Sequence, residues 1–149
     1  MIQIYHEPGG APRYAPSMGQ ERSEGAPQGP PGWLPPATAR LIEDTTQALA
    51  GAFGEGLRAA ILVGAAMNPA RGDRARAPEV LAIVEEAAVA ELGPTCQALR
   101  RVMSAGARVR LLTQRELERS LDVFALEIAE WKARHRLLRG RDPLPALQV

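Results

Sequence analysis

The chain has 149 residues, a length that suits a single domain with its own hydrophobic core. Its formal net charge of +1 excludes a general electrostatic attraction to nucleic acid or to an anionic membrane. The single cysteine excludes an internal disulfide, no run reaches the roughly 18 apolar residues of a membrane span, and the N-terminus lacks a secretory pattern. We therefore expect a cytoplasmic protein that makes no contact with a membrane.

Residues 1–36 are expected to form a disordered tail ahead of one domain at 37–149. The tail contains fourteen glycine and proline residues, few aliphatic residues and no sustained hydrophobic period. Such a segment cannot bury enough apolar surface to offset the entropy lost on ordering it. Within it, Trp33 and Leu34 are the candidates for docking on the domain.

The first half of the domain predicts a helix followed by two strands. Thr38 is the expected N-cap of a helix that ends near Phe53, where glycines follow. The sequence LRAAILVG at 57–64 is a short apolar run bounded by glycines, which is typical of a buried strand. A polar loop at 67–78 leads to a second apolar run, EVLAIV, at 79–84.

The second half predicts a helical region, a third strand and two more helices. Residues 85–106 are mostly helical, with a break at Gly93-Pro94, and 107–113 alternate as a strand. Thr113 and Glu116 then have the spacing of a capping box. A stripe of apolar and aromatic side chains predicts a last helix that ends near Gly140; its members are Phe124, Ile128, Trp131 and His135. The fold class is therefore α/β (α+β), with a small mixed sheet flanked by helices.

Two stretches of the sequence, together with the order of the predicted helices and strands, resemble a known family. Residues 57–84 contain a strand ending in Gly64, a loop with Arg71-Gly72-Asp73, and a second apolar strand. Residues 111–144 contain a threonine-capped helix, Leu-Asp-Val-Phe, a further helix and a Leu-x-Gly-x-Asp-Pro-Leu turn. Over roughly residues 40–144 the chain resembles bacterial members of the nucleotidyltransferase superfamily.

The resemblance implies a nucleotide-transfer site, but its functional residues are replaced. Members of the family bind phosphates with Gly-Ser and hold two Mg²⁺ ions with an Asp-x-Asp or Asp-x-Glu pair. Here Gly64 is followed by Ala65, and the two acidic positions align with Pro78 and Val80. Glu79 lies between these positions and is expected on the opposite face of the strand. The third strand offers Arg108 and Arg110 in place of a third acid.

Two alternatives would preserve nucleotide binding. A shift of one residue in the strand would bring Glu79 to the site together with Asp73. These two residues are the candidate catalytic pair, and they would use Mg²⁺. Alternatively, Arg71, Arg74 and Arg76 could bind phosphate without metal, since guanidinium groups pair well with phosphate oxygens. The nucleotide-binding remnant would then comprise Gly64, Ala65, Arg71 and Arg74.

The remaining candidate functional residues are expected to have structural roles. His135 is expected as a core or rim histidine, and Cys96 as a small buried residue. The basic residues near the end of the last helix complement its dipole, and no aromatic residues interleave with them to stack bases, so a nucleic-acid partner is not expected.

We therefore interpret the chain as a nucleotidyltransferase-like pseudoenzyme that acts as a binding or regulatory module. No cofactor is assigned, apart from Mg²⁺ if the enzyme alternative holds. The candidate partners are a nucleotide, a protein, or a second copy that covers an apolar surface left near the C-terminal turn.

Overall fold

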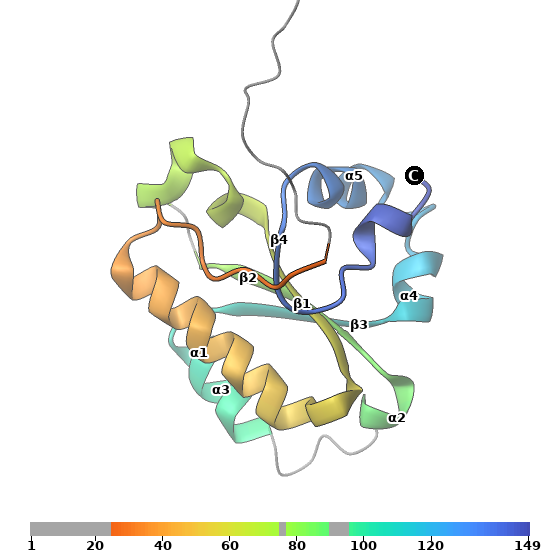
Figure 1. The fold of residues 1–149 in the computed structure, drawn as a ribbon, viewed down its shortest axis with the longest axis horizontal. Coiled ribbons are helices and arrows are strands. Elements are labelled where there is room, and N and C mark those ends of the chain that lie inside the picture. Colours follow the sequence, from red (N-terminus) through yellow and green to blue (C-terminus); the bar gives the residue numbers. More distant parts are fainter. Residues whose placement is uncertain (1–24, 75–76, 90–95) are drawn as a thin grey trace, which may run out of the picture.

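The computed structural model describes residues 25–74, 77–89 and 96–149. Helices and strands alternate along much of this part of the chain (Figure 1). The elements are α1 (Pro36–Phe53), β1 (Leu57–Val63), β2 (Glu79–Val84), α2 (Glu86–Val89), α3 (Cys96–Ser104), β3 (Arg108–Thr113), α4 (Gln114–Arg119), α5 (Ala125–Ala133) and β4 (Arg136–Gly140). Short 3₁₀ turns are η1 (Gly54–Gly56), η2 (Gly64–Met67), η3 (Pro69–Arg74) and η4 (Leu144–Ala146).

The four strands form one mixed sheet in the order β3-β2-β1-β4. The central strand β1 is antiparallel to both β2 and β4, whereas β2 and β3 are parallel. The predicted α/β class with a small mixed sheet is therefore confirmed. The continuous apolar runs of β1 and β2 are explained by their central places, because both faces of these strands are covered.

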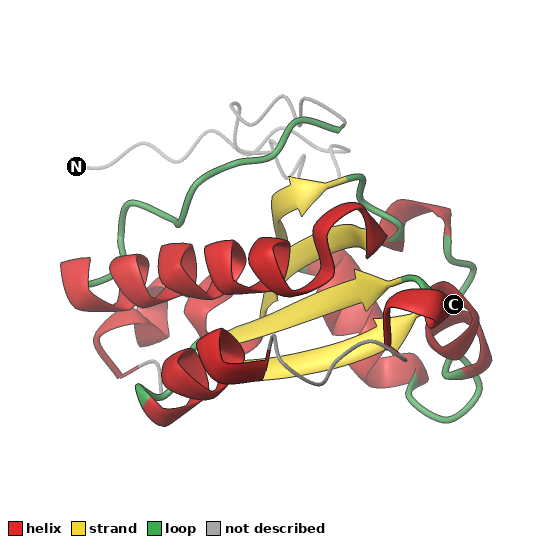
Figure 2. Cartoon of the chain, turned by 90° about the horizontal axis from the view of Figure 1, so that it is seen from below, coloured by secondary structure: helices red, strands yellow, loops and turns green. Residues whose placement is uncertain are grey.

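Helices pack on both faces of the sheet and create two hydrophobic cores (Figure 2). Along β1, Ala60 and Leu62 belong to the core that contains residues of α1 and α3. Ile61 and Val63 point to the other face, where the core includes Ile128 of α5. The alternation of side chains in a strand thus divides one apolar sequence between two layers.

The N-terminal boundary differs from the expectation. The amide of Gln28 donates a hydrogen bond of 2.7 Å to the carbonyl oxygen of Leu137, and the indole N–H of Trp33 donates one of 3.2 Å to that of Ala66. Leu34 is buried, and α1 begins at Pro36 rather than after Thr38. Residues 28–34 thus contact the domain, with Trp33 and Leu34 docked as expected. Residues 1–24 lie outside the described part, as does the expected helix break at Gly93-Pro94.

The prediction of a last helix extending to Gly140 is wrong. Helix α5 ends at Ala133, and Arg136–Gly140 forms the edge strand β4. Residues 136–140 form a strand because they pair with β1 and supply hydrogen-bond partners for the otherwise free edge of this buried strand. Of the predicted stripe, Ile128 and Trp131 are buried, but Phe124 is 49% exposed. Among the described residues, no helix is long and apolar enough to span a membrane.

Candidate functional site

The candidate site begins where β1 ends, at Gly64. This glycine has a φ of +77°, a conformation that residues with a side chain rarely adopt, and it starts the turn η2. Its neighbour Val63 pairs with Glu79 across β1 and β2. A Cβ atom at Gly64 would lie 3.4 Å from Oε2 of Glu79. The structure therefore brings the glycine turn and the Glu79 carboxylate together.

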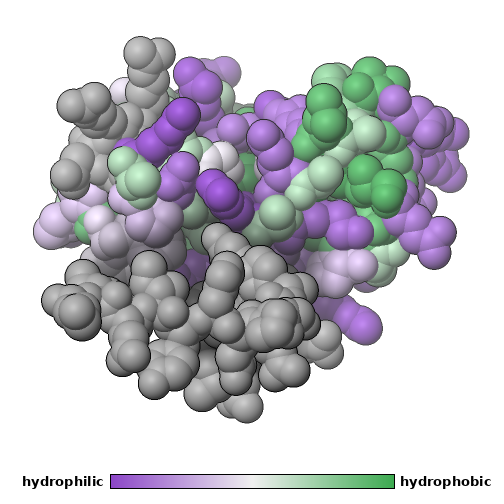
Figure 3. Space-filling view, turned by 90° about the horizontal axis from the view of Figure 1, so that it is seen from above, coloured by the Kyte–Doolittle hydropathy of each residue, from purple (hydrophilic) through white to green (hydrophobic). Residues whose placement is uncertain are grey.

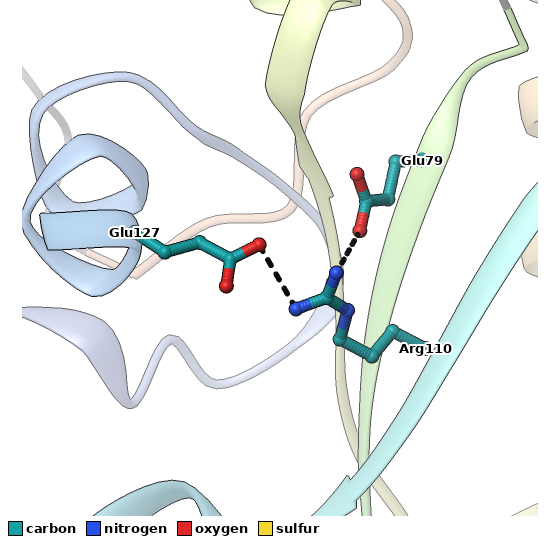
Figure 4. Close-up of polar contacts among 3 residues, drawn as sticks. All are labelled: Glu79, Arg110 and Glu127. Atoms are coloured by element: carbon teal, nitrogen blue, oxygen red, sulfur yellow. Dashed lines mark hydrogen bonds and ion pairs between the residues drawn. The ribbon is translucent and has the colours of Figure 1, made fainter. Parts of the chain in front are cut away.

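Arg110 of β3 connects Glu79 to helix α5. One guanidinium nitrogen of Arg110 lies 3.1 Å from Oε1 of Glu79, and the other lies 3.0 Å from Oε1 of Glu127 (Figure 4). The guanidinium carbon is 5.2 Å from the ring centre of Trp131, in the range of a cation–π contact. Two carboxylates and one aromatic ring thus hold a single cation between β2, β3 and α5.

The charges of this ion-pair triad, Glu79–Arg110–Glu127, do not cancel. Its two carboxylates and one guanidinium sum to −1, and the three side chains are 22%, 41% and 35% exposed for Glu79, Arg110 and Glu127. Partial burial reduces solvent screening, so each glutamate depends on Arg110 more than a fully exposed residue would.

Val80, one of the two aligned acidic positions, and Glu79 lie on different sides of β2. Val80 is buried in the core that contains residues of α1 and α3. Glu79, one residue earlier, points toward Arg110 and α5 (Figure 4). Only one carboxylate from β2 therefore enters the candidate site.

The Arg-rich loop contributes less to the described site than its composition indicates. Arg71 is exposed, and its amide donates to the carbonyl oxygen of Asn68 at 2.9 Å. The backbones of Asp73 and Arg74 belong to η3, but their side chains lie outside the described part, as does Arg76. Of the predicted site residues whose side chains can be compared, the structure joins only Gly64 and Glu79; Ala65 follows Gly64 and is exposed.

Sequence reasoning missed the triad. The sequence presents Arg110 only as a replacement for an acid, and it gives no sign that Glu127 is the partner of this arginine. The alternation of β3 indicates which way Arg110 points, but nothing in the sequence indicates that α5 crosses the same face. Within the part of the chain that the structure describes, no three His, Cys, Asp or Glu side chains gather where they could hold a metal ion.

A second polar pair lies at the C-terminal side of α5. His135 Nε2 is 2.5 Å from Oδ2 of Asp142, and these side chains are 13% and 16% exposed. The other oxygen, Oδ1 of Asp142, accepts the amide of Leu144 at 2.9 Å. His135 is thus a rim histidine as expected, but it follows α5 instead of lying within a helix. The pair ties the C-terminal turn to the core beneath α5.

Comparison with known families, curated proteins and solved structures finds no match for the chain. The resemblance to nucleotidyltransferases therefore depends only on the order and spacing of residues in this chain.

Proposed function

We propose that the chain is a nucleotidyltransferase-like domain that has lost metal-dependent catalysis and acts as a binding or regulatory module. The observation that carries this proposal is the position of Arg110. Its guanidinium lies between Glu79 and Glu127, on the sheet face toward which the only carboxylate of β2 points. A cation of the protein thus pairs with Glu79, the one carboxylate of β2 that could serve a metal ion.

Electrostatics supports a loss of metal binding at this position. Mg²⁺ requires oxygen ligands at about 2.0–2.1 Å in near-octahedral geometry. Two unit charges of like sign about 4 Å apart repel by about 4 kcal/mol at an effective dielectric constant of about 20, and a divalent ion would meet twice that repulsion from Arg110. Without Mg²⁺ the negative charge that develops on a transferred phosphoryl group has no metal partner.

A binding role remains compatible with the residues around the turn. Gly64 and Ala65 are exposed, and Arg71 is an exposed cation on the loop that follows them. An arginine can pair with phosphate oxygens without a metal ion. In this proposal Gly64, Ala65, Arg71 and Arg74 form a remnant that binds a nucleotide or another phosphate-bearing ligand.

One observation favours an active enzyme as the second candidate. Glu79 lies beside the Gly64 turn, where an acidic residue would be useful for transferring a nucleoside monophosphate from a nucleoside triphosphate. This alternative needs Asp73 as the second ligand of Mg²⁺ and a movement of Arg110 away from Glu79. The acceptor would be a small molecule or a protein.

Calorimetric titration with ATP and GTP, each with and without Mg²⁺, distinguishes these functions. We expect any binding to be independent of Mg²⁺ and to weaken when Arg71 is changed to Ala. Binding that requires Mg²⁺ and disappears in the double variant D73A/E79A would replace the proposal by the enzyme alternative. If neither nucleotide binds, the regulatory role must depend on a protein surface.

The importance of the triad can be measured separately through stability. The substitution Arg110→Met keeps most of the aliphatic stem but removes the cation that Glu79 and Glu127 share. We expect the free energy of unfolding to fall by about 1–3 kcal/mol, since two partly buried carboxylates lose their partner.

The matched control is Arg58→Met, which breaks a single pair with Glu85 in which the side chains are 66% and 44% exposed. We expect this change to cost less than about 1 kcal/mol in a urea unfolding experiment. Equal losses in the two variants would contradict a special role for the triad.

A further inference from the structure

Arg136, the first residue of β4, has a guanidinium group that no acceptor satisfies. Its Nε is buried and forms no hydrogen bond, the one such side-chain atom among the described residues. Its two terminal nitrogens are not buried, and no ion pair in the described part of the chain involves them. Arginine stays protonated in proteins, so losing its charge cannot relieve the buried donor. A buried donor without an acceptor is rare in native structures and indicates a missing partner, such as a bound ion.

Strand pairing places Arg136 on the sheet face that α1 and α3 cover. It pairs with Leu62 of β1, whose side chain belongs to the core on that face. The next residue of β4, Leu137, belongs to the opposite core. Directly paired residues of antiparallel strands point to the same face, so the side chain of Arg136 leaves β4 beside the core that contains residues of α1.

The end of β1 and the start of β4 lie at the same end of the sheet (Figure 1). Gly64 follows Leu62 by two residues, which is about 7 Å along a strand and comparable with the length of an arginine side chain. Ala66 of η2 is buried in the same core as Leu62, so the turn bends toward the face of Arg136. Gly64 and Ala65 are exposed and have no bulky side chain. A ligand at this turn can therefore also reach Arg136.

The charges at this end of the sheet favour an anion. Arg71 of η3 is exposed and forms no ion pair with another residue that the structure describes. Glu79 also lies beside the turn, but it points to the opposite face and pairs with Arg110. Figure 3 views the molecule from this end and shows hydrophilic side chains between the grey residues and a hydrophobic area. Two guanidinium groups without carboxylate partners attract a ligand with two negative charges more strongly than one with a single charge.

We propose that Arg136 binds a phosphate group side-on, with one phosphate oxygen on Nε and a second on the adjacent terminal nitrogen. These two donors form one edge of the planar guanidinium group and match two oxygens of a phosphate. The oxygen on Nε requires a small movement of the atoms that now cover this nitrogen, whereas the second oxygen meets an exposed donor. This inference rests on the proposed function in placing a phosphate-bearing ligand at this end of the sheet, and it assigns the phosphate to Arg136.

Titration of the full chain with inorganic phosphate, followed by NMR at constant ionic strength, tests the inference. The Nε–H signal of Arg136, assigned by its loss in Arg136→Lys, should shift with a dissociation constant on the order of 1 mM. The amide signals of Gly64 and Ala65 measure the affinity in the variants as well.

Arg136→Lys keeps the positive charge but removes the edge with two donors, so it should weaken phosphate binding by at least about fivefold. The matched control is Arg139→Lys, at an exposed position on the same strand, which should leave the affinity unchanged. Circular dichroism verifies that both variants fold. Equal affinities in Arg136→Lys and the unmodified protein would overturn side-on binding. The absence of any shift up to about 20 mM phosphate would also overturn the inference and leave water as the partner of Nε.

Titration of the same variants with ATP separates this inference from the proposed function and identifies the source of the phosphate. ATP binding that weakens in Arg136→Lys would support the inference with a nucleotide as the ligand. ATP binding that depends on Arg71 but not on Arg136 would overturn the inference and leave the proposed function standing. Phosphate binding through Arg136 without ATP binding would support a site for free phosphate and contradict a nucleotide ligand.

Discussion

At the scale of single residues, the pair formed by His135 and Asp142 makes stability depend on pH. The hydrogen bond from His135 to the carboxylate raises the pKa of the imidazole above its ordinary value of 6.5, against the opposing effect of burial. Burial by itself raises the pKa of Asp142, but the hydrogen bonds from His135 and from the Leu144 amide outweigh it and leave this pKa below 3.8.

These shifts determine the pH range in which the pair stabilises the fold. A raised pKa of His135 stabilises the folded state fully below pH 6.5, and this contribution is lost as the pH rises through the folded-state pKa. A lowered pKa of Asp142 stabilises the folded state above pH 3.8, and this contribution is lost as the pH falls. The pair therefore contributes most between these two values.

We predict that His135→Gln lowers the free energy of unfolding by roughly 1–3 kcal/mol at pH 5.5, which is about the loss expected for a hydrogen bond between charged groups. The difference from the unmodified protein should shrink as the pH rises through the raised folded-state pKa of His135, where the imidazole becomes neutral. Urea unfolding at a series of pH values measures this difference. A loss that is the same at every pH would show that His135 acts only through packing.

At the scale of elements, β4 depends on a close approach to β1. Gly140 ends β4 with a φ of +81°, and a Cβ there would collide with the carbonyl oxygen of Arg58 and lie 2.8 Å from its carbonyl carbon. The amide of Arg141 donates to this same oxygen at 3.1 Å. The glycine thus allows the chain to leave the sheet edge directly over the backbone of β1.

We predict that Gly140→Ala destabilises the fold by at least about 2 kcal/mol, because left-handed strain and the backbone collision add. The control is Gly51→Ala in α1, where the added Cβ meets no atom within 4 Å and φ is ordinary. That change should stabilise the protein by up to about 1 kcal/mol through helix propensity. Thermal unfolding of both variants measures the two effects, and effects of the same sign would contradict this account.

At the scale of the whole molecule, residues 28–34 belong to the folded unit. This segment hydrogen-bonds to β4 and to η2, and Leu34 lies in the same hydrophobic core as Ile42 and Phe53 of α1. It therefore connects two elements, β4 and η2, that are far apart in sequence. Truncation within this segment would remove core contacts.

We predict that Leu34→Ala lowers the free energy of unfolding by about 2–4 kcal/mol, the usual cost of removing a buried leucine side chain. Trp33→Phe removes the indole hydrogen bond to Ala66 but keeps an aromatic ring, and it should cost about 0.5–1.5 kcal/mol. Chemical unfolding followed by circular dichroism measures both changes. A negligible effect of Leu34→Ala would show that this segment does not contribute to the core, as expected for a tail.

The sequence by itself determined the features that depend on local interactions. The runs at 57–63 and 79–84 are strands, and the capping box at Thr113 and Glu116 forms with both of its hydrogen bonds. Helix α1 ends at Phe53, as the following glycines predict. Propensity, hydrophobic period and capping act over a few residues, so these elements can be predicted from their own residues.

Only the tertiary structure decided the identity of β4 and the partners of Arg110. Residues 136–140 fit the end of a helix, but β1 offers an unpaired edge that they satisfy as a strand. Arg110, Glu79 and Glu127 come from three separate elements, and their contacts depend on how α5 crosses the sheet. The physical reason is the same in both cases: hydrogen bonds and ion pairs between distant segments form only after the packing of layers has placed those segments together.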